Sequence, residues 1–109
     1  MNYSLEYFSE SVRDGIDKWP LGLRARYLAL TLRMEEYGPV LGMPHTRAMG
    51  DGLFEIRVKG SEGIGRAFYC TKVKNRIVIL HGFIKKSEKT PEGDLKLARK
   101  RMKEVLNHE

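Results

Sequence analysis

Three apolar segments separated by very short polar linkers dominate the second half of this 109-residue chain. Each segment has the length of a strand: residues 53–59 (LFEIRVK), 64–73 (IGRAFYCTKV) and 76–85 (RIVILHGFIK). The linkers GSEG and KN are too short for any connection other than a hairpin. The pattern therefore predicts an antiparallel meander of three strands.

A strand and two helices are predicted before the meander. Residues 2–8 alternate apolar and polar side chains, as a half-buried strand does. Ser9 or Ser11 can cap a first helix, and an apolar stripe of Leu23, Tyr27, Leu30 and Met34 predicts a second helix from about Leu21 to Tyr37. The Gly- and Pro-rich segment 38–52 that follows is interpreted as a connecting loop.

A last helix is predicted after the meander, with Thr90 as its N-cap. Leu95, Ala98 and Met102 give this helix a buried stripe. The complete order is β-α-α-β-β-β-α. The expectation is a single α+β domain over residues 1–109, with a small, mainly antiparallel sheet.

Basic residues are concentrated in the second part of the chain, and this asymmetry bears on the kind of partner. The net charge is +6. Residues 1–40 hold five Lys and Arg against six Asp and Glu, a net of −1, whereas residues 41–109 hold fifteen against eight, a net of +7. Such a distribution is typical of a domain that binds a polyanion or an acidic protein, although many small domains are basic for solubility alone.

The sequence also bears on the compartment. The N-terminus lacks the basic and apolar regions of a signal peptide, and no stretch approaches the roughly 20 apolar residues that span a bilayer. The single Cys70 cannot form an internal disulfide. We therefore expect a reduced, cytoplasmic protein that does not bind a membrane.

The hairpins predict which residues share each face of the sheet. With a four-residue GSEG loop Arg57 faces Arg66, and with a two-residue KN turn Arg66 faces Phe83 and Phe68 faces His81. Side chains alternate between the two faces of a sheet. The core face covered by helices is expected to hold Phe54, Ile56, Val58, Ala67, Tyr69, Val78, Leu80 and Ile84. The opposite face is expected to hold Glu55, Arg57, Lys59, Arg66, Phe68, Cys70, Ile79, His81, Phe83 and Lys85.

The second face has the composition of an RNA-binding surface. Arg57 and Arg66 lie side by side, an arrangement that costs up to about 1 kcal/mol, and Glu55 cannot neutralise both together with the nearby lysines. Arginine binds phosphate bidentately, and an aromatic ring stacks on an unpaired base. Lys59, Phe68 and Phe83 are therefore predicted to bind RNA together with the two arginines.

Each of these residues also has a structural interpretation. Arg57 can be a solvated strand residue, and His81, in an apolar run, can be a hydrogen-bonded structural histidine. Phe68 and Phe83 can cover a small apolar patch or contact the terminal helix. A register slip of one residue would send all of them to the other face.

Cleavage of RNA is a reaction that these side chains permit. The 2′-hydroxyl can attack the neighbouring phosphorus if a base takes its proton, an acid protonates the leaving oxygen and cations stabilise the added charge. The candidate catalytic residues are Arg57, Arg66, His81, Lys85 and Lys86. One cysteine and three scattered histidines give no metal-ligand spacing, and no glycine-rich loop precedes a helix, so neither a metal nor a cofactor is expected.

The segments GLFEIRVKG, GRAFYC and ILHGFIKKSEKTP together resemble the HigB branch of the RelE/ParE superfamily, the phage-derived kind of bacterial type II toxin. The resemblance implies a RelE-like fold, with two N-terminal helices packed on one face of the sheet. It implies ribosome-dependent, metal-independent cleavage of messenger RNA, which leaves a 2′,3′-cyclic phosphate and a 5′-hydroxyl. Its implied partners are the ribosome, mRNA and a HigA-like helix-turn-helix antitoxin, with DNA contacted only through the antitoxin complex.

The resemblance also implies roles for particular residues. Arg57 and Arg66 fall where the family has basic residues that bind phosphate and stabilise the transition state, and Lys85 and Lys86 fall where a strand-end cation assists the leaving group or the scissile phosphate. The chain lacks the C-terminal tyrosine of several RelE-type toxins. The superfamily includes ParE proteins, which act on DNA gyrase without cutting RNA, and a nucleic-acid-binding module without catalysis is a further alternative.

The last helix offers a second basic surface. Arg99 and Lys100 lie on a face of this helix that can rest on ribosomal RNA. A plain solvated face is the alternative interpretation, because runs of charge on a helix are commonly exposed.

Overall fold

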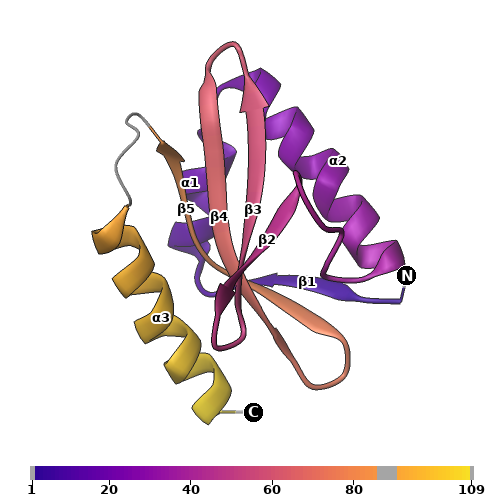
Figure 1. The fold of residues 1–109 in the computed structure, drawn as a ribbon, viewed down its shortest axis with the longest axis vertical. Coiled ribbons are helices and arrows are strands. Elements are labelled where there is room, and N and C mark those ends of the chain that lie inside the picture. The colour runs from indigo at the N-terminus through magenta and orange to yellow at the C-terminus, as the bar shows by residue number, and fades with distance from the viewer. Residues whose placement is uncertain (1, 86–90, 109) are drawn as a thin grey trace.

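The computed structural model describes residues 2–85 and 91–108 (Figure 1). Its elements in chain order are β1 (Ser4–Tyr7), α1 (Glu10–Asp17), α2 (Leu21–Tyr37), β2 (Thr46–Gly50), β3 (Leu53–Gly60), β4 (Gly63–Lys72), β5 (Arg76–Lys85) and α3 (Glu92–Asn107). The five strands form one sheet in the order β1-β5-β4-β3-β2. β1 runs parallel to β5, and the other neighbours are antiparallel. The predicted α+β class with a mainly antiparallel sheet is confirmed.

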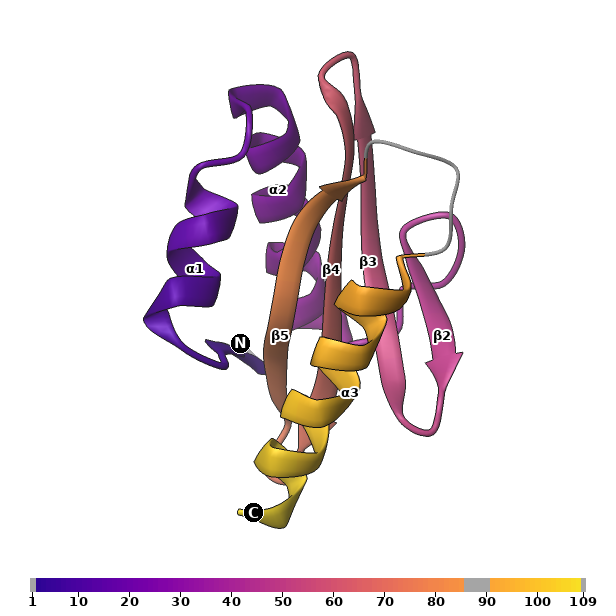
Figure 2. The same ribbon diagram turned by 90° about the vertical axis from the view of Figure 1, so that its left-hand side faces the viewer.

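The sheet separates two helical layers. Figure 2 shows α1 and α2 on one face and α3 on the other, and each layer has its own core cluster against the sheet. The expectation that both N-terminal helices pack on one face is therefore confirmed. None of the described helices is long and apolar enough to cross a membrane.

The helices begin and end close to where their sequence signals lie. Ser9 caps α1 by accepting a hydrogen bond from the Val12 amide at 3.3 Å. α2 has the predicted bounds and buries its predicted stripe, which comprises Leu23, Tyr27, Leu30 and Met34. The proposed N-cap of the last helix, Thr90, lies outside the described residues.

One strand was not predicted. The segment interpreted as a loop contains β2, an edge strand that pairs with β3 from Thr46↔Ile56 to Gly50↔Leu53, with an irregularity between Ala48 and Gly50. Three of its five residues are exposed. A short edge strand needs no apolar alternation, and the surrounding Gly and Pro residues are typical of a loop.

The β4–β5 hairpin differs from the prediction at its turn. Lys72 pairs with Arg76, so the loop has three residues, and the register shifts opposite Phe68 and Tyr69 because β5 contains one extra residue, Leu80. This β-bulge restores the predicted pairs beyond it. Between the turn and the bulge, the side chains of β5 project to the faces opposite those predicted.

Three face assignments are therefore wrong. Val78 and Leu80 lie in the cluster with α3, whereas Ile79 lies in the cluster with α1 and α2. An extra residue reverses the alternation of every side chain on one side of it, and nothing in the local sequence marks its position.

α1 and Trp19, which follows it by two residues, approach the sheet closely at two glycines. A Cβ atom at Gly82 would lie 2.5 Å from Ile16 Cγ1, and one at Gly65 would lie 2.6 Å from Trp19 Cζ3. Ile16 and Trp19 are both buried, so neither side chain can withdraw without opening the core. Glycine at these two positions allows α1 to seat on the sheet.

Gly82→Ala is expected to lower the free energy of unfolding by about 2 kcal/mol, because the added methyl group overpacks the core against Ile16. Gly15→Ala is the matched control. It lies on α1, where a Cβ would meet nothing within 4 Å, and is expected to raise stability by up to about 1 kcal/mol. Urea denaturation followed by circular dichroism measures both. Equal effects would contradict the close seating of α1.

β1 is joined to its neighbours by two polar contacts. Arg76 of β5 donates through Nε and Nη2 to the Glu6 carboxylate. This hydrogen bonding, helped by the positive charge of Arg76, holds the pKa of Glu6 below its ordinary value of 4.5. The hydroxyls of Tyr7 and Tyr27 lie 3.0 Å apart, and burial raises the pKa of both. β1 is thus tied to β5 on its edge and to α2 on its face.

Glu6→Gln is expected to cost up to about 1 kcal/mol at neutral pH, because both partners are about one-third exposed and solvent screens the pair. The folded-state pKa of Glu6 is lowered, so its contribution is present above pH 4.5 and is lost as the pH falls below that value. Denaturation curves of both proteins across this range should therefore converge in acid. A constant difference would assign the effect to packing.

Candidate nucleic-acid interface

Cross-strand pairs of β3, β4 and β5 form a regular grid on the sheet face opposite α1 and α2. Its three rows are Lys59–Ile64–Lys85, Arg57–Arg66–Phe83 and Glu55–Phe68–His81. Directly paired residues have Cβ atoms roughly 5 Å apart. The predicted pairing of Arg57 with Arg66, Arg66 with Phe83 and Phe68 with His81 is confirmed. We refer to this grid as the basic face.

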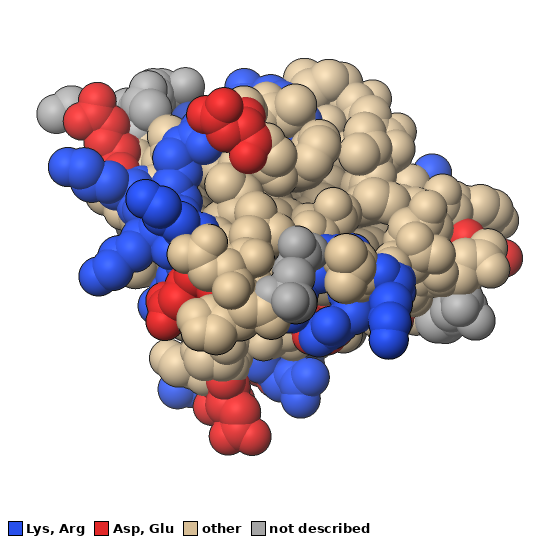
Figure 3. Space-filling view, turned by 90° about the horizontal axis from the view of Figure 1, so that it is seen from below, with Lys and Arg blue, Asp and Glu red and all other residues tan. Residues whose placement is uncertain are grey.

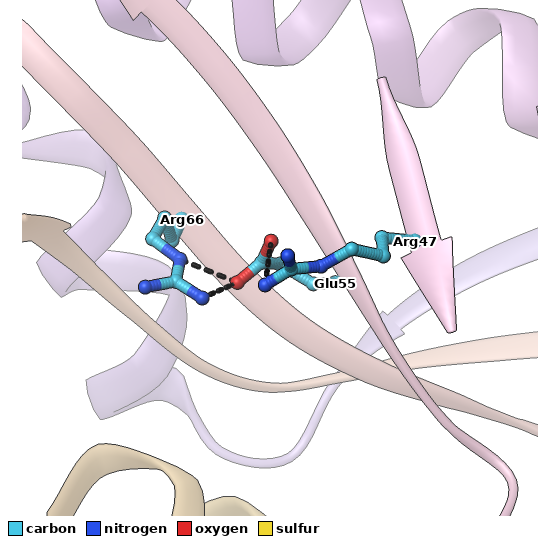
Figure 4. Close-up of polar contacts among 3 residues, drawn as sticks. All are labelled: Arg47, Glu55 and Arg66. Atoms are coloured by element: carbon cyan, nitrogen blue, oxygen red, sulfur yellow. Dashed lines mark hydrogen bonds and ion pairs between the residues drawn. The ribbon is translucent and has the colours of Figure 1, made fainter. Parts of the chain in front are cut away.

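A buried ion pair occupies the centre of the basic face. Arg66 donates from Nε and Nη2 to Glu55 Oε2, and Arg47 Nη2 of β2 lies 3.6 Å from Glu55 Oε1 (Figure 4). Arg66 is 3% exposed and Glu55 is 1% exposed. Glu55 therefore balances Arg66 and relieves the repulsion expected between Arg57 and Arg66. The sequence gives no signal for Arg47, because β2 lacks the apolar alternation that predicts a strand.

α3 covers the lower part of the basic face, which corrects two expectations. Phe68 is fully buried against Ala98 and Met102, so the prediction that it stacks on a base is wrong and the alternative, contact with the terminal helix, holds. The Arg66 guanidinium lies over the rings of Phe68 and Phe83, at 5.8 and 5.6 Å. Buried and paired in this way, Arg66 is not positioned to contact a phosphate directly.

A histidine–carboxylate pair lies where α3 meets the basic face. His81 Nε2 is 2.6 Å from Asp94 Oδ1, in the first turn of α3. The His81 ring also stacks on Phe83, with centroids 5.5 Å apart and 20° between the planes. The carboxylate favours the tautomer with the proton on Nε2, which leaves Nδ1 as the acceptor. The His81 side chain is 19% exposed. The pair is therefore partly accessible from solvent.

The sequence pointed to His81 but gave no signal for Asp94. The two residues are 13 positions apart and belong to different elements. Their contact depends on the path of α3 across the sheet, and an acidic residue in the first turn of a helix is ordinarily explained by the helix dipole.

The accessible cations of the basic face are Arg57, Lys59 and Lys85. Lys59 is exposed, and Arg57 and Lys85 are half-buried. Arg57 Nε is buried without a hydrogen-bond acceptor among the described residues, so an anionic ligand would satisfy a donor that is otherwise unpaired. Phe83 is the half-buried aromatic ring of the face. Lys86, the remaining predicted catalytic residue, lies outside the described residues.

The basic residues of α3 divide into two kinds. Arg99 donates to the Met49 carbonyl at 2.8 Å, and Arg101 donates to the carbonyl of the bulge residue Leu80 at 2.8 Å. These arginines hold α3 on the sheet, which gives Arg99 a structural role beside the predicted RNA contact. Lys100 is exposed, and Figure 3 shows Lys and Arg gathered with some acidic residues on the side where α3 lies.

The donor types of the basic face match anion binding and proton transfer. Guanidinium and ammonium groups stabilise negative charge, and an imidazole held by a carboxylate can move a proton. Among the described residues, no group of three or more His, Cys, Asp or Glu is placed to hold a metal ion.

Glu55→Gln is expected to lower the free energy of unfolding by about 3 kcal/mol, because it leaves the buried charge of Arg66 uncompensated. Arg47→Ala removes the other partner of Glu55. The Arg47 side chain is 45% exposed, so this change is expected to cost under about 1 kcal/mol. Guanidinium denaturation measures both. The double replacement Glu55→Leu/Arg66→Met should recover most of the loss, and a loss at least as large as that of Glu55→Gln would contradict the pairing.

Comparison with known proteins identifies the fold and the family of this chain. A mutant form of the E. coli toxin RelE, solved in the free state, superimposes with a TM-score of 0.65 over 97% of this chain and 100% of that chain, at 13% sequence identity. The fold is therefore that of the RelE toxin. The chain belongs to the Gp49-like family of phage-derived proteins (DUF891), whose family model matches residues 14–103. No curated protein sequence matches the chain.

Proposed function

We propose that the chain is the toxin of a toxin–antitoxin pair, of the HigB kind, and that it inhibits translation by cutting messenger RNA on the ribosome. The observation that carries the proposal is the meeting of the His81–Asp94 pair with the cations Arg57 and Lys85 on one face. The RelE fold and the Gp49-like family support the same proposal.

In the proposed reaction the 2′-hydroxyl of one nucleotide attacks the adjacent phosphorus. His81 Nδ1 takes the hydroxyl proton as the new O–P bond forms, and the Lys85 ammonium gives a proton to the 5′-oxygen as the old P–O bond breaks. Arg57 and Lys59 stabilise the added negative charge on the phosphorane. The products are a 2′,3′-cyclic phosphate and a 5′-hydroxyl.

Other residues act by positioning these groups. Asp94 orients His81. Arg66, held by its ion pair with Glu55, packs its guanidinium over the Phe83 ring and so fixes that ring in place. Phe83 is the ring on which an unpaired base would stack. Lys86, the residue after Lys85 in the sequence, belongs to the proposed set of cations.

The proposed partners are those that the resemblance to HigB toxins implies. They are the ribosome, mRNA and a HigA-like helix-turn-helix antitoxin, through which alone the toxin would contact DNA. The proposed site of action is the cytoplasm, where translation takes place.

Induction of the wild-type chain is expected to produce cuts in a translated reporter mRNA, detected by primer extension, and no cuts when the start codon is removed. His81→Gln and Arg57→Ala are each expected to reduce cutting by about 100-fold or more, and Asp94→Asn by less. Lys18→Ala is the matched control. It removes an exposed charge directly after α1, on the other side of the sheet from α3 (Figure 2), and should leave cutting unchanged.

The same experiment separates the alternatives. Growth arrest with intact mRNA would contradict the proposal and favour a ParE-like action on gyrase. No arrest, together with salt-dependent binding of intact RNA, would favour a non-catalytic binding module. Circular dichroism of each variant distinguishes loss of activity from loss of fold.

A further inference from the structure

α2 carries a second apolar stripe that the core does not use. Leu21, Leu28 and Leu32 are 72%, 49% and 53% exposed, and the exposed Ala25 lies between the first two. Their spacing of four, three and four residues is that of a helix–helix seam. The stripe extends over about three turns, roughly 16 Å of helix.

This stripe lies on the far side of α2 from the core. The core stripe comprises Leu23, Tyr27, Leu30 and Met34, all buried. One apolar stripe is enough to seat a helix on a sheet, and a row of exposed leucines on a soluble domain marks an interaction surface. α2 is therefore apolar on two sides while one side is covered.

A basic cleft adjoins the exposed stripe. It has a volume of about 590 Å³ and lies between α2, the edge of β3 and the loop before β2. Its lining includes the cations Arg26, Arg33, Arg57 and Lys59 and the apolar Leu30, and no Asp or Glu. The exposed Ala29 also lines the cleft and separates it from the leucine stripe by a short side chain.

The edge of β3 is open beside this cleft. β2 pairs with β3 only as far as Ile56, and the Arg57 amide then donates to the His45 carbonyl at 2.9 Å. Residues 58–60 extend beyond the end of β2. The cleft is thus open along the edge of the sheet.

We propose that the α2 stripe and the basic cleft together dock an acidic amphipathic helix of a partner protein. The apolar side of that helix packs on Leu21, Leu28 and Leu32, and the small Ala25 and Ala29 let its backbone approach closely. Its acidic flank pairs with the cations of the cleft. Glu35 and Glu36 follow Leu32 by one turn and would repel acidic residues of the partner helix. The acidic flank is therefore placed beside Arg26 and Arg33.

The other occupants fit less well. An RNA strand would use the cations but would leave the exposed leucines in water, because its backbone is charged throughout. A second copy of this chain would bring its own basic cleft towards the first, and each copy carries a net charge of +6. The inference does not depend on the proposed function, because it concerns α2 and not the cleavage of RNA.

Panning of a phage-displayed library tests the inference. Peptides of about 20 residues, long enough for a helix of roughly 30 Å, are selected on the immobilised full chain. The peptides that bind are expected to be acidic and to repeat apolar residues with helical period. Fluorescence anisotropy then measures their binding to Leu28→Asp/Leu32→Asp and Arg26→Glu/Arg33→Glu, each expected to bind at least about tenfold more weakly.

Leu106→Asp is the matched control, since it changes an exposed leucine of α3, 37% exposed, in the same way. It should bind the selected peptides as the wild type does. The inference is overturned if no peptide is enriched, if the enriched peptides lack acidic residues, or if the α2 variants bind them as well as the control. It is also overturned if the leucine variant abolishes dimers or the binding of a single-stranded RNA instead of peptide binding.

Discussion

One extra residue in β5 decides which side chains reach each face of the sheet. Below the bulge, Ile79 faces the layer of α1 and α2, and Val78 and Leu80 face α3. Above it the alternation is reversed, so His81 lies on the same side as Leu80. A regular strand that keeps Leu80 in the α3 core would turn His81 towards α1. The bulge thus lets one strand bury leucine under α3 and still present the imidazole to Asp94.

The bulge is bonded directly to α3. Arg101 donates to the Leu80 carbonyl, and Arg99 donates to the carbonyls of Met49 and Gly50 at the end of β2. With α3 fixed at both points, Phe68 is buried. The row Glu55–Phe68–His81 of the basic face then lies against α3, and the rest of the face is open. The Glu55–Arg66 pair lies at this boundary, where a charge without a partner would be costly. Stability and the candidate chemistry therefore share one arrangement of side chains.

The sequence predicted the parts of the fold that repeat regularly and missed those that depend on single departures from regularity. α2 and the pairing of Arg57 with Arg66 follow from period and loop length, so they were predictable. β2 has no apolar alternation, and the bulge at Leu80 leaves no local mark, so neither was. For the site, the cations and His81 were predictable from the sequence because their side-chain chemistry suits RNA binding and cleavage. It could not find Asp94, because that contact arises from the docking of a helix distant in the sequence.

The two proposed surfaces share one element, β3. Arg57 and Lys59 belong to the basic face and also line the cleft beside α2. Carboxylates of a helix seated on α2 would therefore lie near the cations that the proposed reaction uses for phosphate. Because Arg57 Nε has no acceptor among the described residues, a carboxylate and a phosphate would compete for the same donor. A partner docked on α2 could thus silence the basic face by charge competition at its edge, without displacing α3 or disturbing the buried Glu55–Arg66 pair.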